Sequence, residues 1–204
     1  MKYFVIGPQG SGKGTQAVHL AKKFDIPHLG AGDMLRAEKA SGSDLGKEIA
    51  ALIDRGKLVP SEMVWTMVKQ QLEQHPEGWI LDGYPRTLDQ ADLLDEEHKP
   101  DTVILLDVHD EVCVARIEGR RICPVCSKNY HIEYHKPKEA GKCDDDGAAL
   151  EHRTDDTEKR VRRRLEIYHN KTKKLVDHYA DRLVHINGDQ EIPVVWAEIE
   201  EKLA

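Results

Sequence analysis

The chain has 204 residues, of which 39% are hydrophobic and 33% are charged, and its formal net charge is −7. This length can bury one sizeable core, and the acidic balance argues against nucleic acid as a partner. No apolar run is long enough to cross a membrane, and the N-terminus lacks the basic and apolar regions of a signal peptide. We therefore expect a cytoplasmic protein without a membrane partner. No coiled-coil pattern or apolar stripe suggests an oligomer, so a monomer is expected.

Short apolar runs alternate with longer amphipathic stretches along the chain. The apolar runs predict strands at 3–6, 27–29, 79–81, 102–106 and 183–186. The amphipathic stretches predict helices at 15–24, 32–40, 44–55, 61–74, 87–94, 111–121, 155–180 and 192–203. Asp33 and Ser61 are the expected caps of two of these helices. The alternation predicts an α/β fold with three α/β/α layers around a five-stranded parallel sheet.

The first expected strand leads into the glycine-rich stretch GPQGSGKGT at 7–15, and a helix follows. This is the context of a phosphate-binding loop, in which successive backbone N–H groups and a helix N-terminus face a phosphate. Lys13 supplies a positive charge for the outer phosphates, and Ser11 or Thr15 can reach a phosphate or its magnesium. In the common pattern a serine or threonine follows the lysine directly, but here Gly14 intervenes. This departure marks one branch of the phosphate-loop proteins.

Two segments interrupt the alternation. Residues 31–59 are predicted to be helical throughout, where one crossover helix would suffice. Residues 122–152 lack helical periodicity and are rich in Gly, Pro, Cys, His and Asp. Loops of this length inside compact domains usually form lids or binding modules.

The second of these segments, called the cysteine module below (residues 122–152), has the spacing of a metal site. Cys123 and Cys126 are separated by two residues, and Cys143 and Asp146 repeat that spacing with a carboxylate in place of one sulfur. Four such ligands suit a tetrahedral ion and leave no open position, which predicts a structural role. Four other side chains compete for the fourth position: His131, His135, Asp144 and Asp145. The repeated spacing and the turn at Gly147 favour Asp146.

Zinc is the expected ion, although thiolates also accept cobalt and iron. A segment with few large apolar groups cannot build a core of its own, and a bound metal compensates for that. A redox role for Cys123 and Cys126 is less consistent with the sequence, because no thioredoxin-like strand precedes them. Cys113 lies in an apolar helical pattern and is expected to be a small buried residue.

Further motifs follow the phosphate loop in chain order: GDMLR at 32–36, GKLVP at 56–60, DGYPRT at 82–87, GRR at 119–121 and RTDD at 153–156. In this order they resemble the nucleoside monophosphate kinases, and most closely the bacterial adenylate kinases with a zinc-bearing lid. The resemblance covers essentially the whole chain. It implies reversible phosphoryl transfer from MgATP to AMP, giving two ADP, so ATP and AMP are the expected partners.

The resemblance also implies a domain division. Residues 1–29, 60–118 and 157–204 would form the core domain, residues 30–59 the monophosphate-binding domain, and residues 119–156 a lid that carries the metal site. Lid closure would exclude water, which otherwise accepts the phosphoryl group.

The resemblance assigns roles residue by residue. The expected catalytic residues are Lys13, Arg86, Arg120, Arg153 and Arg164. The expected ATP contacts are Gly10, Ser11, Gly12, Lys13, Gly14, Thr15, Arg116, Arg120, Asn129, Tyr130 and Gln190. The expected AMP contacts are Ala31, Arg36, Lys57, Leu58, Val59, Gly83, Tyr84, Pro85, Arg86, Gln90, Arg153 and Arg164. Asp82 and Asp33 are expected to orient the waters of a magnesium ion that bridges the ATP phosphates.

The arginines suit this chemistry because a planar guanidinium binds two phosphate oxygens at once. No side chain is needed as a base, since the acceptor phosphate is already a nucleophile.

One departure from the family pattern concerns the acceptor base. The family usually has Ser-Thr before Gly-Asp-Met, whereas this chain has Gly30 and Ala31 there. In having alanine at this position, the chain resembles the uridylate/cytidylate kinases. A kinase that prefers UMP or CMP is therefore one alternative. Gln90 favours AMP, because its amide can pair with the donor–acceptor edge of adenine. A second alternative is a noncatalytic zinc-ribbon protein that senses nucleotides, but the arginines along the chain and the acidic charge count against it.

Overall fold

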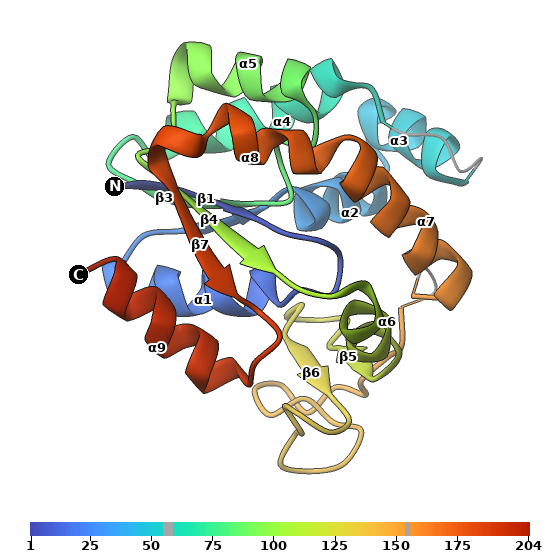
Figure 1. Ribbon diagram of the computed structural model, residues 1–204. Helices are drawn as coiled ribbons and strands as arrows, with labels where there is room; N and C mark the ends of the chain where they lie inside the picture. Colours follow the sequence, from blue (N-terminus) through green and yellow to red (C-terminus); the bar gives the residue numbers. More distant parts are fainter. Residues whose placement is uncertain (55–58, 154–155) are drawn as a thin grey trace. The chain divides into compact units, whose positions relative to one another are not determined.

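The computed structural model describes residues 1–54, 59–153 and 156–204, and these form a five-stranded sheet with helices around it (Figure 1). The strand order is β2-β3-β1-β4-β7. The strands are β1 (Lys2–Ile6), β2 (His28–Gly30), β3 (Trp79–Asp82), β4 (Thr102–Asp107) and β7 (Leu183–Asn187). The predicted α/β fold with a five-stranded sheet is confirmed, and every predicted strand is present within one or two residues.

The central strands are apolar because both faces of the sheet are covered. Val103, Ile104 and Leu106 of β4 are fully buried. β1 pairs in parallel with β3 on one side and with β4 on the other, so that Val5 lies opposite both Asp82 and Ile104. A strand buried on both faces reads as one continuous hydrophobic run, which explains why these strands could be predicted from sequence.

The helices also follow the predicted alternation. They are α1 (Lys13–Phe24), α2 (Ala31–Ser41), α3 (Asp44–Asp54), α4 (Ser61–Gln74), α5 (Leu88–His98), α6 (Asp110–Glu118), α7 (Glu158–Asn170), α8 (Leu175–His178) and α9 (Ile192–Lys202). The two predicted caps are wrong. Gly30 precedes the first residue of α2, which puts Asp33 inside the first turn. Ser61 is itself the first residue of α4, and its hydroxyl binds Asp89 instead of a backbone N–H.

The long helix predicted for 155–180 is interrupted. The helix ends at Asn170, and short 3-10 turns at Thr172–Lys174 and Ala180–Arg182 flank the single turn α8. Lys171 has φ −122° and ψ −58°, which lies outside the helical region. The break places Thr172 where its buried hydroxyl donates to the backbone oxygen of Arg86 at 2.9 Å. A nonlocal hydrogen bond of this kind leaves no trace in local periodicity.

The helix predicted for 111–121 ends three residues early, at Glu118. Arg120 and Arg121 instead belong to β5 (Arg120–Ile122), which pairs in antiparallel fashion with β6 (Asn129–His131). Gly119 makes this close pairing possible, because a Cβ atom there would lie 2.2 Å from the ring of His131.

The described chain divides into two compact units. The first unit comprises residues 1–6, 17–105 and 171–184, and the second comprises residues 7–16, 106–170 and 185–204. In the first unit, α4 packs its buried face, including Val64, Val68 and Leu72, against β3. In the second unit, α6 and α7 share an apolar contact that includes Cys113 and Leu165. None of the described helices is long and apolar enough to span a membrane.

Candidate functional site

The glycine-rich loop of the second unit has the geometry of a phosphate cradle. Gly10 and Gly12 have φ angles of 90° and 92°, which L side chains rarely adopt. A Cβ atom on Gly10 would also lie 2.5 Å from the backbone oxygen of Cys113, so α6 packs directly against the loop. α1 begins at Lys13, and the N–H groups of its first turn have no partners within the helix. The loop and the helix start therefore offer backbone donors to an anion.

Buried polar atoms without a partner surround this cradle. Among the described residues, Ser11 Oγ, Gln9 Oε1 and Gln16 Oε1 are buried and make no hydrogen bond. Ser11 is only 3% exposed. The Lys13 ammonium donates to the Pro8 carbonyl across the loop at 2.9 Å. Buried polar groups are normally paired, so unpaired ones beside a phosphate loop indicate the place of a ligand.

Arg116 connects this loop with Gln190, another predicted ATP contact in the same unit. Its guanidinium donates to the backbone oxygens of Gly188 and Gln190, each at 2.9 Å, and to that of Ser11 at 3.4 Å. The structure thus brings together three of the predicted ATP contacts, which lie far apart in the sequence. Burial raises the pKa of the neighbouring Cys113 thiol to about 12, which keeps it neutral beside the loop.

Two predicted ATP contacts lie in the cysteine module. Asn129 is exposed on β6, whereas Tyr130 is 2% exposed and belongs to the small core of the module. The Tyr130 hydroxyl accepts from the backbone N–H of Asp144 at 2.8 Å. The Tyr130 ring thus supports the module from inside, and its contact with ATP stays a prediction.

Three predicted catalytic arginines lie in the second unit. Arg120 on β5 forms an ion pair with Asp156, whose side chain is fully buried. Its Nε lies 2.8 Å from Asp156 Oδ2. Arg153 and Arg164 are both half-buried, and Arg164 lies on α7. The Asp156 carboxylate therefore holds the Arg120 guanidinium in a defined orientation.

Apart from Arg153 and Arg164 of the second unit, the predicted acceptor residues that the structure describes lie in the first unit, which contains Arg86. Gln90 Oε1 accepts from the backbone N–H of Arg86 at 2.8 Å, and Thr172 Oγ1 donates to its backbone oxygen. The Arg86 Nε donates to the Gly83 carbonyl at 2.8 Å. Gln90 Nε2 in turn donates to Ser61 Oγ at 3.1 Å. Arg86 is thus fixed through its backbone and its side chain, and the sequence did not predict the hydrogen bonds of Ser61 and Thr172 in this network.

The other predicted acceptor contacts differ in their surroundings. Ala31 is 2% exposed and packs in the core with Leu29 and Val64. Tyr84 is buried as well, and its hydroxyl donates to the backbone oxygen of Gln90 at 3.3 Å. Val59 packs against the same core, while Gly83 and Pro85 flank Tyr84 in the turn after β3. Lys57 and Leu58 lie outside the described residues.

The two aspartates predicted to orient magnesium waters both lie in the first unit. Asp33 forms an ion pair with Arg36, another predicted acceptor contact, one turn further along α2. Asp82 ends β3, where its carboxylate lies 3.7 Å from Nε2 of His28. A carboxylate at the carboxyl end of a parallel strand is well placed for a ligand, since such ends border the binding crevice of open α/β sheets.

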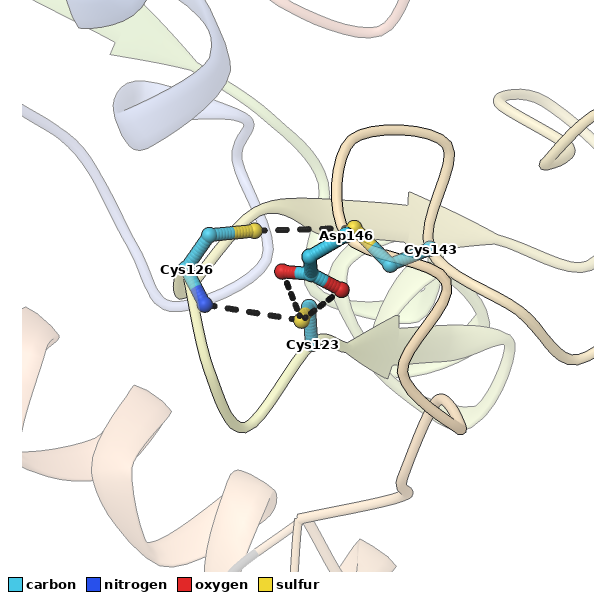
Figure 2. Close-up of side chains that lie close together, drawn as sticks. All are labelled: Cys123, Cys126, Cys143 and Asp146. Carbon is cyan, nitrogen blue, oxygen red and sulfur yellow. Dashed lines mark hydrogen bonds between the residues drawn. The ribbon is translucent and has the colours of Figure 1, made fainter.

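The structure brings together the four predicted metal ligands. Cys123, Cys126, Cys143 and Asp146 each offer one ligand atom, and these atoms all lie within 4.8 Å of one another (Figure 2). Cys126 Sγ lies 3.5 Å from Cys143 Sγ, and Cys123 Sγ lies 3.2 Å from Asp146 Oδ2. A tetrahedral ion with bonds of about 2.3 Å to sulfur keeps its sulfur ligands about 3.8 Å apart. The donor set therefore fits zinc or an ion of similar preference.

The competing fourth ligands have other partners in the structure. Asp144 accepts from the backbone N–H of Lys138, and Asp145 pairs with the Lys128 ammonium at 2.7 Å. The His135 Nδ1 atom lies 3.0 Å from the backbone oxygen of Asn129. His131 Nδ1 accepts from the backbone N–H of Glu133 at 3.0 Å.

Asp146 faces the cysteines and is held in that orientation by its backbone surroundings. Its Oδ1 atom accepts from the backbone N–H of Ala148 at 2.9 Å. This bond, together with that from the Cys123 thiol, lowers the pKa of the Asp146 carboxyl to about 2. The group is therefore ionised at neutral pH, as a metal ligand must be.

Comparison with known proteins shows the family of the chain. The chain matches a family model described as adenylate kinase over residues 5–184. An adenylate kinase from Methanothrix thermoacetophila is 42% identical, covering 100% of this chain and 99% of its own length. One from Archaeoglobus fulgidus is 44% identical over 98% of this chain and 96% of its own length. A chloroplastic adenylate kinase from Zea mays is 42% identical over 100% of this chain and 91% of its own length.

Proposed function

The chain belongs to the adenylate kinase family and is an ATP:AMP phosphotransferase, and we propose how its residues divide this work. The phosphate loop and Lys13 hold the phosphates of ATP. The arginines surround the transferred phosphoryl group and the acceptor phosphate. Together they supply what phosphoryl transfer needs from a protein, which is positioning and neutralisation of charge.

On the donor side, the backbone donors of the loop and the Lys13 ammonium bind the outer phosphates, and Ser11 or Thr15 adds a hydroxyl. Arg116 and the backbone at Gln190 form the site of the base and ribose. The bonds from Arg116 to the Gly188 and Gln190 carbonyls support this assignment, because they place a planar cation beside the loop. Magnesium, bound to the ATP phosphates, would neutralise charge that develops on them, and Asp82 and Asp33 would orient its waters.

On the acceptor side, Arg36, Arg86 and the turn at 83–86 bind the AMP phosphate and base. Gln90 fixes the backbone of Arg86 and presents its amide at this site. The AMP phosphate attacks directly, so no general base is required. Arg120, Arg153 and Arg164 approach the same phosphoryl group with guanidinium forks, which bind two oxygens at once.

Residues 119–156 act as a lid that closes over ATP and excludes water. Residues 30–59 form the monophosphate-binding domain. The core domain consists of residues 1–29, 60–118 and 157–204. A structural metal, zinc in our proposal, holds the lid together through Cys123, Cys126, Cys143 and Asp146. The complete four-ligand set supports a structural role, since a catalytic metal keeps an open position. We further expect a cytoplasmic monomer without nucleic acid or membrane partners.

The observation that carries the donor assignment is the phosphate cradle with its buried, unpartnered Ser11 hydroxyl. Lys13→Ala tests it. Turnover should fall about 100-fold or more, because a charge aimed at the transferred phosphoryl group is lost. Lys22→Ala, on an exposed position near the end of the same helix, is the matched control and should turn over at the wild-type rate. A Lys13→Ala variant that loses affinity for ATP but keeps its turnover would point to a nucleotide sensor and overturn the catalytic assignment.

A coupled assay of ADP formation with AMP, UMP and CMP tests the acceptor. AMP should be the preferred acceptor, because Ala31 packs in the core and its missing hydroxyl changes little at the base. Comparable or faster turnover with UMP or CMP would overturn this preference.

A further inference from the structure

A cavity of about 580 Å³ lies within the second unit, and none of its lining residues belongs to the phosphate loop or to the cysteine module. It is lined by residues from the end of β4, the start of α6, the end of α7, and β7 with the loop after it. Three imidazoles and three carboxylates face it: His109, His169, His185, Asp107, Asp110 and Asp189. This concentration of metal-ligating side chains in one cavity has no part in the proposed phosphoryl transfer.

Each of the three imidazoles is paired with a different carboxylate of the cavity. The pairs are His109 Nδ1 with Asp189, His169 Nε2 with Asp110 at 2.9 Å, and His185 Nε2 with Asp107 at 3.1 Å. His109 and Asp189 are further tied by a bond from the His109 backbone N–H to Asp189 Oδ1 at 3.0 Å. The same arrangement thus occurs three times around one space, on elements that are distant in sequence.

A carboxylate on one ring nitrogen is the usual outer partner of a metal-binding histidine. It fixes the tautomer and the ring orientation, and it makes the other nitrogen more basic. The other nitrogens here are Nε2 of His109 and Nδ1 of His169 and His185. Within the described part of the chain, none of these three atoms makes a hydrogen bond. Each ring therefore has one nitrogen positioned by a carboxylate and one nitrogen available to a ligand.

We propose that this cavity binds a divalent transition-metal ion of the nickel, copper or zinc type through the three histidines. Imidazole nitrogens with nearby carboxylates suit these ions better than magnesium or calcium, which prefer oxygen ligands. This site is distinct from the cysteine module and does not rest on the proposed function.

Binding requires the rings to move together. In the cysteine module all four ligand atoms lie within 4.8 Å of one another, and the three histidines form no such group. The side chains of His109, His185 and His169 are 86%, 58% and 44% exposed, and those of their paired carboxylates are 26%, 65% and 41% exposed. Each ring can therefore shift toward a common ion together with its carboxylate.

A second cluster of potential metal ligands is already neutralised by a lysine. Glu73, Glu97 and His98 of the first unit have ligand atoms within 4.8 Å of one another. The Lys69 ammonium, however, lies 2.5 Å from Glu97 Oε2 and 3.9 Å from Glu73 Oε1. The lysine already supplies the positive charge that these carboxylates need, so we assign no ion there.

The test is a calorimetric titration of the full chain with Ni²⁺, after its cysteine module has been filled with one equivalent of zinc and unbound zinc has been removed. One Ni²⁺ should bind per chain, and His109→Gln, His169→Gln and His185→Gln should each weaken binding about tenfold or more. His178→Gln is the matched control, because His178 is paired with Asp95 at 2.9 Å but does not line the cavity. This variant should bind Ni²⁺ with wild-type affinity. Circular dichroism of each variant checks that it is folded.

An independent readout is the side-chain NMR spectrum of the histidines. Paramagnetic Ni²⁺ should broaden the imidazole signals of His109, His169 and His185 together at one equivalent and leave that of His178 unchanged. Asp107→Asn should weaken Ni²⁺ binding about tenfold while leaving all three imidazoles in place. Absence of Ni²⁺ binding beyond the cysteine module, or binding that only one of the three substitutions weakens, would overturn the shared site.

Discussion

The central sheet and the cysteine module are stabilised in different ways. In the sheet, strands β1, β3 and β4 each contain a continuous run of buried side chains, including Phe4, Leu81 and Ile104. In the module, the buried cluster consists of Cys123, Tyr130 and Cys143, with Ala148 and Leu150 packed against it. Removal of apolar area from water can stabilise the sheet by itself, whereas the module lacks enough apolar area for this.

This difference in stabilisation suits a rigid sheet and a mobile module. A close-packed core allows few alternative arrangements, which suits elements that must position a phosphate loop. A segment held by one group of ligands can move as a unit while its own structure is kept, which suits a lid. The predictions below test whether the two regions depend on these separate sources of stability.

Removal of the metal should have the largest effect. On the proposed structural role, chelation or Cys143→Ser should unfold the module, because binding of a structural zinc supplies about 10–16 kcal/mol in isolated zinc fingers. Hydrogen exchange should show lost protection at the amides of Ile122 and Cys143, while the amides of β3 and β4 keep theirs. The melting temperature should fall more than the turnover measured at a permissive temperature.

Asp145→Asn is the matched control for Cys143→Ser. Asp145 lies in the same turn and pairs with Lys128 at the surface, where an ion pair contributes about 0–1 kcal/mol. This variant should melt close to the wild type. Loss of activity by the Cys143→Ser variant without any loss of stability would contradict the structural role of the metal.

Leu81→Ala should have the next largest effect, and it should be confined to the apolar region. Leu81 is fully buried in β3, so the substitution leaves a cavity and should lower the free energy of unfolding by about 3–5 kcal/mol. Denaturant unfolding measures this loss. Leu88→Ala, at a position that is 41% exposed, should lower it by less than about 1 kcal/mol. Equal losses from the two variants would show that the sheet does not depend on close packing.

Much of this contrast could be predicted from sequence, because both sources of stability leave local patterns. The strands are continuous apolar runs, and the four ligands repeat a two-residue spacing. The hydrogen bonds that connect distant segments left no such pattern. Neither the bond from Thr172 to Arg86 nor that from Gln90 to Ser61 could be predicted, since each joins residues far apart in the chain.

The same limit explains the wrong helix boundaries. Helical periodicity continues through Lys171, but a tertiary contact of Thr172 ends the helix before it. The buried position of Tyr130 likewise depends on the folding of the module around it, which no local pattern indicates. Local patterns therefore predict elements and ligand sets, while the contacts between elements require the structure.

Tyr130→Phe should have a smaller effect than either of the first two changes. It removes a hydroxyl that binds the backbone N–H of Asp144 and lies 3.4 Å from Cys143 Sγ. The lost hydrogen bond should destabilise the module by about 1 kcal/mol and speed metal release, as measured with a colorimetric chelator. Tyr134→Phe, at a position that is 61% exposed, is the control and should release the metal at the wild-type rate. Equal rates for Tyr130→Phe and the wild type would show that this hydroxyl does not support the ligands.

The smallest effect should come from a surface ion pair at the end of β4, which depends neither on packing nor on the cysteine ligands. The hydrogen bond to Asp189 raises the pKa of His109, and the nearby charges of Asp189, Asp107 and Asp110 add to this. Burial alone would raise the pKa of the Asp189 carboxyl, but its bonds with the His109 ring and backbone outweigh this and lower it.

The raised pKa of His109 means that its contribution to stability is fully present below the unfolded value of about 6.5 and is lost as the pH rises through the folded value. The difference in melting temperature between the wild type and His109→Gln should therefore be larger at pH 5.5 than at pH 8.5. Both proteins are melted with the cysteine module saturated with zinc and with no other transition metal present. The difference should stay small even at pH 5.5, because the His109 side chain is 86% exposed and water screens the pair. If this difference in melting temperature were the same at both pH values, the His109–Asp189 pair would contribute nothing to stability. Packing and the metal ligands would then account for the stability of the two regions.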